Sequence, residues 1–251
     1  MLDKLRFYVH FILKFGERKR FKKETPDVKI PPDYLIYESF NLNYNSYYHG
    51  GRKSAEWLLH CLEKHVNLTN IVLLDWGCGP ARIVRHIPDL LDKSCKIYAT
   101  DYNARTIAWN KKNIKDVIFS DNKTNPPLSY DKSFFHIVYG ISIFTHLPEE
   151  LHYSWFNELV RVTKNGGIVF LTLQGDAFRM KLTDDEQKAY EKGYLVIRGK
   201  TKIGHRTYSA FHPKDFVHKL MDGHQILEHI PGEIIHNKPS QDVWIVKIIK
   251  E

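Results

Sequence analysis

Residues 75–79 read Asp-Trp-Gly-Cys-Gly and directly follow the wholly apolar run Ile71–Leu74. Such a short apolar run is typical of a strand buried on both faces of a parallel sheet. Gly77 and Gly79 permit a tight turn and let a ligand approach the backbone without a Cβ in the way. Open parallel sheets bind ligands at the carboxyl ends of their strands. We therefore predict a ligand-binding loop here.

The acidic residue of this loop favours a cationic ligand. A dinucleotide-binding loop reads Gly-x-Gly-x-x-Gly or Ala, but its last position here is Arg82. S-adenosylmethionine (SAM) instead carries an ammonium group beside a sulfonium. We expect SAM to contact Asp75, Gly77, Cys78 and Gly79, aided by the N-terminus of a following helix. The alternative is that Asp75 caps that helix and the glycines only form a turn.

The loop resembles the first motif of the class I SAM-dependent methyltransferases, an acidic residue followed by x-Gly-x-Gly-x-Gly. Ala81 occupies the last glycine position, which leaves room for only a small side chain. The resemblance implies that Asp101 binds both ribose hydroxyls, since a carboxylate has two acceptor oxygens. Tyr102 would cover the adenine. Alternatively, Asp101 caps the helix that starts at Asn103.

Later segments agree with this family in the same order, from about Arg52 to Gly175. Asp121 and Asn122 end the third strand, where the family contacts the adenine amine, although such a pair is also ordinary turn chemistry. Residues 139–147, with Ile141 expected at the cofactor, resemble the fourth motif of a subgroup. This subgroup resembles bacterial methyltransferases found with glycan and cell-surface polysaccharide assembly.

Methyl transfer to a hydroxyl group needs a proton acceptor, and histidine suits this role near neutral pH. His146 lies just beyond the fourth strand and is the first candidate. His212 follows a predicted substrate lid, and His205 is a third candidate. Each residue also has a structural alternative. His146 could instead bind a backbone carbonyl or cap a helix. His212 could cap the helix that starts at Pro213.

Strands and helices must alternate to position these residues. The predicted fold is α/β, with a doubly wound, mostly parallel seven-stranded sheet, a C-terminal antiparallel hairpin and helices on both faces. The expected strands are 71–74, 96–100, 117–119, 135–139, 168–173, 225–230 and 242–249. The expected helices are 54–65, 81–91, 103–112, 149–162, 184–192 and 213–221, with a hairpin over 194–208 around Gly199 or Gly204.

We predict an arm and connector at residues 1–50, extended over 22–37, and a SAM-binding domain at 51–251 with a lid at about 176–211. Residues 1–30 hold nine Lys/Arg against four Asp/Glu, so much of the net charge of +8 lies there. Wound as a helix, Met1–Phe15 has an apolar face followed by a basic cluster. Residues 1–23 could contact an anionic membrane peripherally. The alternatives are docking on the chain's own domain or on a second subunit, as in a homodimer.

The uneven charge argues against a nucleic-acid partner. The three cysteines form no close pair, so we expect a cytoplasmic protein. If the arm binds lipid, the protein would lie at the inner face of the membrane. No metal-ligand spacing is evident, so we expect no metal. The polar, aromatic and basic lid favours O-methylation of a sugar or another hydroxylated acceptor, neutral or anionic, that is a small molecule or a glycan. The alternatives are a small-molecule N- or O-methyltransferase of secondary metabolism, an RNA methyltransferase, a non-catalytic SAM-fold subunit and a nucleotide-binding oxidoreductase.

Overall fold

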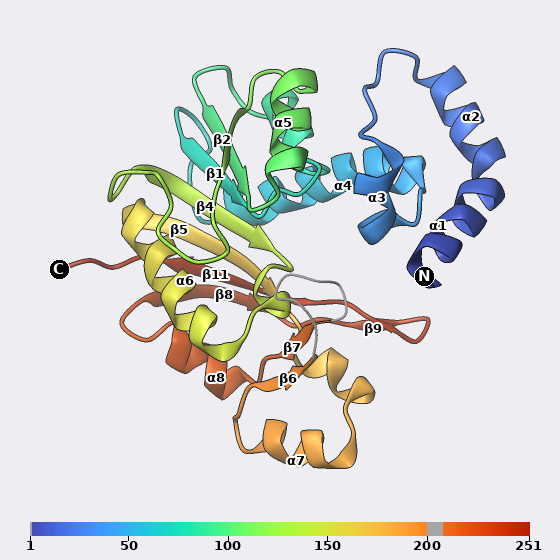
Figure 1. Ribbon diagram of the computed structural model, residues 1–251. Coiled ribbons are helices and arrows are strands. Elements are labelled where there is room, and N and C mark those ends of the chain that lie inside the picture. Colours follow the sequence, from blue (N-terminus) through green and yellow to red (C-terminus); the bar gives the residue numbers. More distant parts are fainter. Residues whose placement is uncertain (1, 200–207) are drawn as a thin grey trace. The chain divides into compact units, whose positions relative to one another are not determined.

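Seven strands form the sheet of the computed structural model, which describes residues 2–199 and 208–251 (Figure 1). Their order is β3-β2-β1-β4-β5-β11-β8. β3 runs parallel to β2, and β4 runs parallel to both β1 and β5, whereas β11 is antiparallel to β5 and β8. The predicted α/β fold with a C-terminal antiparallel pair is confirmed. In sheet order the strands span Ile118–Asp121, Lys96–Asp101, Val72–Trp76, Phe135–Ile141, Thr163–Leu173, Asp242–Lys247 and Gln225–Ile230.

By its contacts the chain divides into two compact units, one of residues 1–70 and 78–121 and one of 71–77 and 122–251. The first unit holds β2, β3 and most of the N-terminal helices. Its helices are α1 (Leu2–Leu13), α2 (Phe15–Glu24), α3 (Asp33–Phe40), α4 (Tyr44–Glu63), the 3₁₀ helix η1 (Val84–Asp89) and α5 (Ala104–Asn113).

Helix α4 starts ten residues before the predicted helix at 54–65. The Asn43 side chain caps it by accepting a hydrogen bond from the Ser46 N–H at 2.9 Å. Tyr44 and Tyr47 on its first turns are buried with Phe21 and Ile36. The predicted extended connector at 22–37 is therefore wrong in part, because α2 continues to Glu24 and α3 starts at Asp33.

The helix predicted at 81–91 is also wrong. A series of turns follows the glycine loop, and only the short 3₁₀ helix η1 forms. Ala81 has a φ of +57°, which is incompatible with a right-handed helix. Pro88 lies inside the segment and has no N–H to donate to an α-helical hydrogen bond. The expected contribution of a helix N-terminus to the ligand site is therefore absent from residues 80–83.

The second unit holds the remaining strands and the lid. Helix α6 (Glu149–Val162) matches the prediction, with Pro148 at its N-cap. β6 (Val196–Arg198) and β7 (Ser209–Phe211) pair antiparallel, as the predicted hairpin requires, while its expected turn at Gly204 lies outside the described residues. The other elements are η2 (Phe144–His146), η3 (Asp176–Lys181), α7 (Asp184–Glu191) and α8 (Lys214–Leu220).

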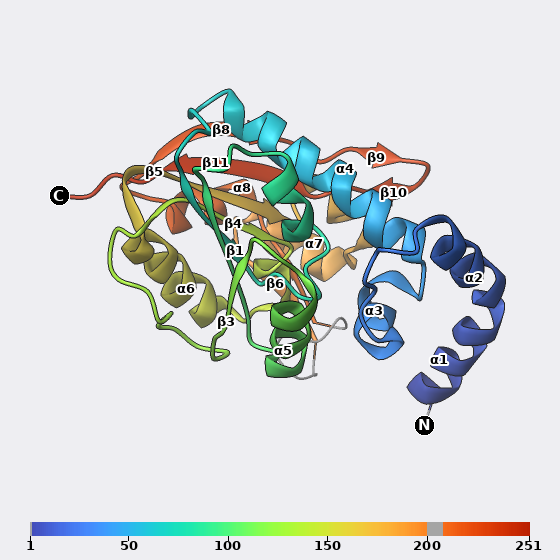
Figure 2. The same ribbon diagram turned by 90° about the horizontal axis from the view of Figure 1, so that it is seen from above.

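A small hairpin of β9 (Ile234–Ile235) and β10 (Lys238–Pro239) lies between β8 and β11 and was not predicted (Figure 2). Its turn residues His236 and Asn237 both have positive φ, of 49° and 59°. Two positive φ values in succession are typical of the tight turns that join antiparallel strands.

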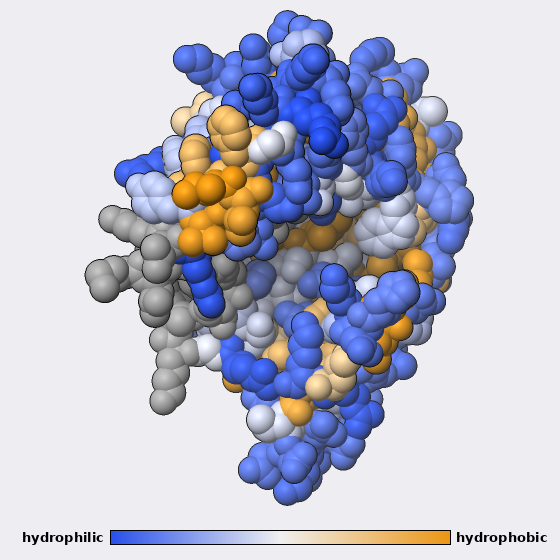
Figure 3. All heavy atoms as spheres, turned by 90° about the vertical axis from the view of Figure 1, so that its right-hand side faces the viewer, coloured by the Kyte–Doolittle hydropathy of each residue, from blue (hydrophilic) through white to orange (hydrophobic). Residues whose placement is uncertain are grey.

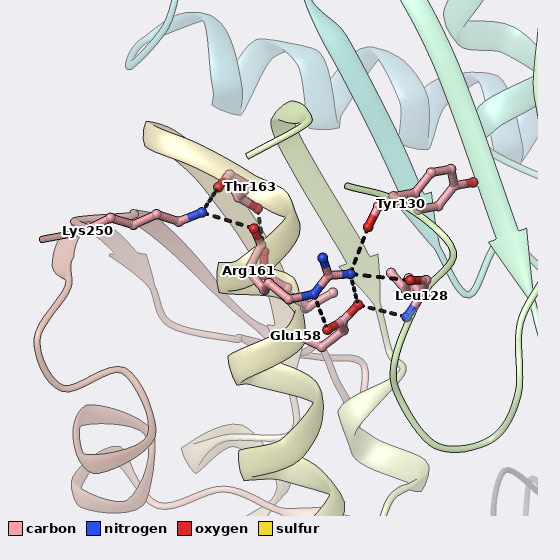
Figure 4. Close-up of polar contacts among 7 residues, drawn as sticks. Leu128, Tyr130, Glu158, Arg161, Thr163 and Lys250 are labelled. Atoms are coloured by element: carbon pink, nitrogen blue, oxygen red, sulfur yellow. Dashed lines mark hydrogen bonds and ion pairs between the residues drawn. The ribbon is translucent and has the colours of Figure 1, made fainter. Parts of the chain in front are cut away.

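The buried Glu158 carboxylate ties α6 to the loop before β4 (Figure 4). It accepts hydrogen bonds from the Leu128 N–H at 2.7 Å and from two nitrogens of Arg161 at 2.7 and 2.8 Å. Arg161 also donates to the carbonyl oxygen of Tyr130 at 2.9 Å. Lys250 donates to the carbonyl oxygens of Arg161 and Thr163 near the end of the helix. None of the described helices is both long and apolar enough to cross a bilayer.

Candidate active site

In the first unit, the glycine loop is held to the end of β2 by backbone hydrogen bonds. The Cys78 N–H donates to the Thr100 carbonyl at 2.9 Å, and the Gly79 N–H donates to Asp101 Oδ2 at the same distance. Asn110 from α5 donates to the Gly79 carbonyl, also at 2.9 Å. Cys78, Gly79 and Asp101, three of the predicted cofactor-binding residues, are therefore brought together here.

Asp101 does not cap helix α5. The cap is Asn103, whose side chain accepts from the Arg105 and Thr106 N–H groups. The second oxygen of Asp101 accepts from the Asn103 N–H at 2.8 Å. Burial raises the pKa of Asp101, although the N–H groups of Asn103 and Gly79 oppose this by stabilising the carboxylate. Each oxygen accepts one of these backbone hydrogen bonds and retains further lone-pair capacity for a hydroxyl group.

Helix α4 supports the same loop from the other side. The Tyr47 hydroxyl donates to the Pro80 carbonyl at 2.6 Å and accepts from Arg85 at 3.0 Å. Burial raises the pKa of Tyr47 to about 12, so it remains a donor at neutral pH. A Cβ on Gly51 would lie 2.2 Å from the Arg82 carbonyl oxygen, which explains why α4 carries a glycine where it meets the loop.

In the second unit, Asp75 and Gly77 occupy the last part of β1 and the residue after it. Asp75 is buried within the strand, opposite Tyr139 of β4, so it does not cap a helix. Gly77 has a φ of +81°, and a Cβ there would lie 2.2 Å from the Ile143 side chain. Glycine is therefore required at this position on both conformational and steric grounds.

A closed network of polar side chains follows Ile141 at the end of β4. Ser142 has a φ of +63°, and its N–H donates to Thr172 Oγ1 at 2.9 Å. Thr172 donates to the amide oxygen of Gln241 at 2.6 Å, and the Gln241 amide nitrogen donates to Ser142 Oγ at 2.7 Å. A strained backbone held by such a network is common at functional sites.

His146, in η2, is oriented by the lid. Its Nδ1 lies 2.8 Å from the carbonyl oxygen of Tyr208, just before β7. Because a carbonyl oxygen can only accept, Nδ1 carries the proton and Nε2 is the basic nitrogen of the neutral ring. The carbonyl contact that was the structural alternative for His146 is therefore present. The same contact fixes the tautomer that a general base needs.

The comparison with known families decides the nature of the domain. Residues 73–167 match the family described as "Methyltransferase domain". The family assignment therefore holds for this stretch, which is less than half of the chain. The matched stretch contains the glycine loop, Asp101, Asp121, Asn122, Ile141 and His146. No curated protein matches the sequence significantly.

Solved structures show the same fold at low sequence identity. A SAM-dependent methyltransferase from Methanosarcina mazei has a TM-score of 0.58 and 16% identity, covering 76% of this chain and 98% of that one. The PH0226 protein from Pyrococcus horikoshii has a TM-score of 0.57 and 18% identity, covering 87% and 100%. Magnesium protoporphyrin IX methyltransferase from Synechocystis, with bound S-adenosylhomocysteine (SAH), has a TM-score of 0.55 and 12% identity, covering 96% and 98%.

The residues of the methyltransferase domain fit SAM as cofactor. A Cβ on Gly79 would meet no atom within 4 Å, so open space faces the loop backbone. In the second unit, the buried carboxylate of Asp75 suits an ammonium group, and in the first unit, that of Asp101 suits a pair of ribose hydroxyls. The cofactor of the methyltransferase domain is SAM. Among the described residues, no group of three or more His, Cys, Asp or Glu could hold a metal ion.

The predicted adenine contacts lie at strand ends. Tyr102, after β2, is half exposed. Asp121, the last residue of β3, is exposed and lies opposite Asp101 in the parallel register of β2 and β3. Asn122 belongs to the second unit and its side chain donates to the Lys123 carbonyl at 2.6 Å. Their roles toward adenine stay predictions.

His212 is buried and paired with His152 of α6. His152 Nδ1 donates to the Pro148 carbonyl at 2.9 Å, so its Nε2 accepts from His212 Nε2, also at 2.9 Å. The remaining nitrogen of His212 is buried without a partner in the described part of the chain. This placement favours the structural alternative for His212, here a link between the lid and α6. His205, the third candidate, lies outside the described residues.

We expect this histidine pair to make the fold sensitive to acid. Burial lowers the pKa of His152 to about 4 and that of His212 well below its usual range. Unfolded histidines take up protons near pH 6.5, so stability is full above that pH and falls as the pH drops toward 4. At about pH 5 the loss from His152 alone should be about 2 kcal/mol. Urea unfolding at about pH 7 and pH 5 measures it.

His152→Gln is the matched variant for this measurement. It removes one titrating group, so its loss of stability between the two pH values should be smaller than that of the unaltered protein. Gln225→Ala, an exposed change in β8 that removes no titratable group, is the control and should leave the pH dependence unchanged. An equal pH dependence in His152→Gln would show that the pair is not a source of acid sensitivity.

Proposed function

We propose that the protein is a SAM-dependent methyltransferase that O-methylates a sugar or another hydroxylated acceptor. When bound, SAM supplies a methyl group activated by a positively charged sulfur. The observation that carries the proposal is the orientation of His146, whose basic Nε2 is set by the hydrogen bond from Nδ1 to Tyr208. A hydroxyl group must lose its proton as the methyl group arrives, and a neutral histidine can accept it.

The lid supports a neutral hydroxylated acceptor over a strongly anionic one. Arg198 forms an ion pair with Glu186 and lowers the pKa of that carboxyl to about 2. Arg179 forms an ion pair with Glu191. These pairs largely neutralise both guanidinium groups, and residues 176–199 hold five Lys/Arg against five Asp/Glu. The Tyr194 ring is 65% exposed, and an exposed aromatic ring with hydrogen-bonding groups near it suits a sugar.

His146→Ala is expected to lower turnover by about 100-fold, the usual lower range for loss of general-base catalysis. SAM affinity should stay within about twofold, because the histidine is assigned to the acceptor and not to the cofactor. Single-turnover rates and calorimetric titration with SAM measure the two effects. His60→Ala on the exposed side of α4 is the control. Unchanged turnover would exclude His146 as the base and favour N-methylation of an amine, which needs little base catalysis.

The acceptor can be found by incubating the protein with methyl-labelled SAM and fractionated extracts that include lipid-linked glycans. Label in a glycan, stable to conditions that cleave methyl esters, supports the proposal. Label in an amine supports the small-molecule alternative. SAM binding without label in any fraction supports a non-catalytic subunit. A lipid-linked sugar would require the protein at the inner face of the membrane, contacted through residues 1–23, and a homodimer remains a further proposal.

A further inference from the structure

Helix α1 exposes a row of large apolar side chains. Figure 3 shows an apolar patch, in orange, on the face of the molecule that carries α1. The exposed fractions of its largest members are far above those of core residues. They are Tyr8 at 61%, Val9 at 47%, Ile12 at 73%, Leu13 at 70% and Phe15, the first residue of α2, at 60%.

The opposite side of these helices is fixed to the first unit. The ring of Phe7 packs edge-on against Tyr37 of α3, with 5.2 Å between ring centroids. Arg18 is buried, donates to Asp33 at 2.5 Å and donates to the Phe11 carbonyl at 2.7 Å. Phe21 is 1% exposed. Within the first unit, the apolar row is therefore held outward by contacts on its other side.

A cluster of cations continues the same face. Helical hydrogen bonding passes through the junction, since the Lys14 N–H donates to His10 O and the Arg18 N–H donates to Lys14 O. With 3.6 residues per turn, positions 4, 7, 11, 14 and 15 residues after Tyr8 lie on one side. In order these are Ile12, Phe15, Lys19, Lys22 and Lys23. The three lysines are exposed, as is Arg20 beside them, and α2 carries only Glu17 and Glu24 as acidic residues.

We infer that α1 and α2 bind the surface of an anionic lipid membrane. Tyr8, Ile12 and Phe15 enter the boundary between head groups and acyl chains, and Lys19, Lys22 and Lys23 lie at the lipid phosphates. A second copy of the chain is a poorer occupant. A symmetric contact centred on the apolar row would pair apolar side chains but would supply no anionic counterpart to the lysine cluster of α2. An anionic surface instead complements both halves of the face.

Vesicle flotation of the full chain tests this inference without SAM, so its outcome is independent of the proposed methyl transfer. The protein should float with phosphatidylglycerol-containing vesicles at low salt, and much less with phosphatidylcholine alone or at high salt. The triple variant Lys19→Glu, Lys22→Glu, Lys23→Glu and the single variant Ile12→Glu should each lower the bound fraction by about tenfold. Both alter exposed residues, and an unchanged thermal midpoint verifies the fold.

Two matched controls place the same changes elsewhere. Lys111→Glu with Lys112→Glu reverses two exposed charges near the end of α5, and Ile235→Glu alters an exposed isoleucine of β9. Both should float like the unaltered protein. Equal flotation of the triple variant, or equal binding to neutral vesicles, overturns the inference. Sedimentation equilibrium tests whether a second copy binds this face instead. A dimer of the unaltered protein that dissociates in the Ile12→Glu variant would overturn the inference and assign the face to a second copy.

Discussion

Asp101→Asn is expected to weaken SAM binding by about 100-fold, the loss that corresponds to roughly one strong hydrogen bond to a charged group. The carboxylate already accepts the N–H groups of Gly79 and Asn103, one on each oxygen. Asparagine has the same shape but replaces one acceptor oxygen with a donor. Either a ribose hydroxyl or a backbone N–H then loses its acceptor. Calorimetric titration with SAM and SAH measures the loss.

The same variant should lose some stability, by about 1–3 kcal/mol, because a buried backbone N–H is left facing an amide donor. Thermal unfolding without ligand measures this cost separately from the affinity. Asp92→Asn is the control, since Asp92 is exposed and accepts only local hydrogen bonds from the turn at Ser94. SAM affinity within about threefold of the unaltered protein would reduce Asp101 to a structural support of the glycine loop.

The alternation of apolar runs and amphipathic segments was enough to predict the sheet. Strands buried on both faces must be nearly continuous in apolar residues, and Leu73, Leu74, Val138 and Phe170 are fully buried. Helix α6 was predicted to its end residues because Pro148 marks its start and the following acidic residues suit a first helical turn.

The errors arose where tertiary contacts override local preference. Nothing local distinguishes Asp33–Phe40 from an extended segment after two prolines, but Arg18 and Tyr44 both bind Asp33 and so fix the start of α3. The turns after the glycine loop depend on the positive φ of Ala81, a conformation usually left to glycine. The β9–β10 hairpin has two residues in each strand, too few for a periodic signal.

The candidate site residues were chosen where one residue type suits one chemical group, as with Asp101, and their roles toward SAM stay predictions. Its supporting residues were mostly missed because they come from far along the chain. Asn110 is 31 residues from the glycine whose carbonyl it binds, and Gln241 is 99 residues from Ser142. Tyr47 lies 33 residues before Pro80, and no local pattern indicates that its hydroxyl donates to the Pro80 carbonyl. The pairing of His152 with His212 likewise has no local signal.

Glu158→Ala is expected to destabilise the protein by about 3 kcal/mol, within the range for breaking a buried ion pair by removing one partner. The carboxylate accepts hydrogen bonds from the Leu128 N–H and from Nε and Nη2 of Arg161 (Figure 4). Without it, the Leu128 N–H loses its acceptor, and the Arg161 guanidinium loses its carboxylate partner and keeps only the carbonyl oxygens of Leu128 and Tyr130. For a chain of this length the thermal midpoint should fall by about 6–12 °C.

An exposed ion pair offers the matched comparison for this effect. Glu56→Ala removes the partner of Arg52 on α4, where both side chains are nearly half exposed, and should cost less than about 1 kcal/mol. Glu158→Gln separates charge from hydrogen bonding, since it retains an acceptor for the Leu128 N–H but cannot satisfy both nitrogens of Arg161. We expect its unfolding free energy to lie between those of Glu158→Ala and the unaltered protein. Equal stability of Glu158→Ala and Glu56→Ala would show that the loop before β4 is held by apolar packing and not by this carboxylate.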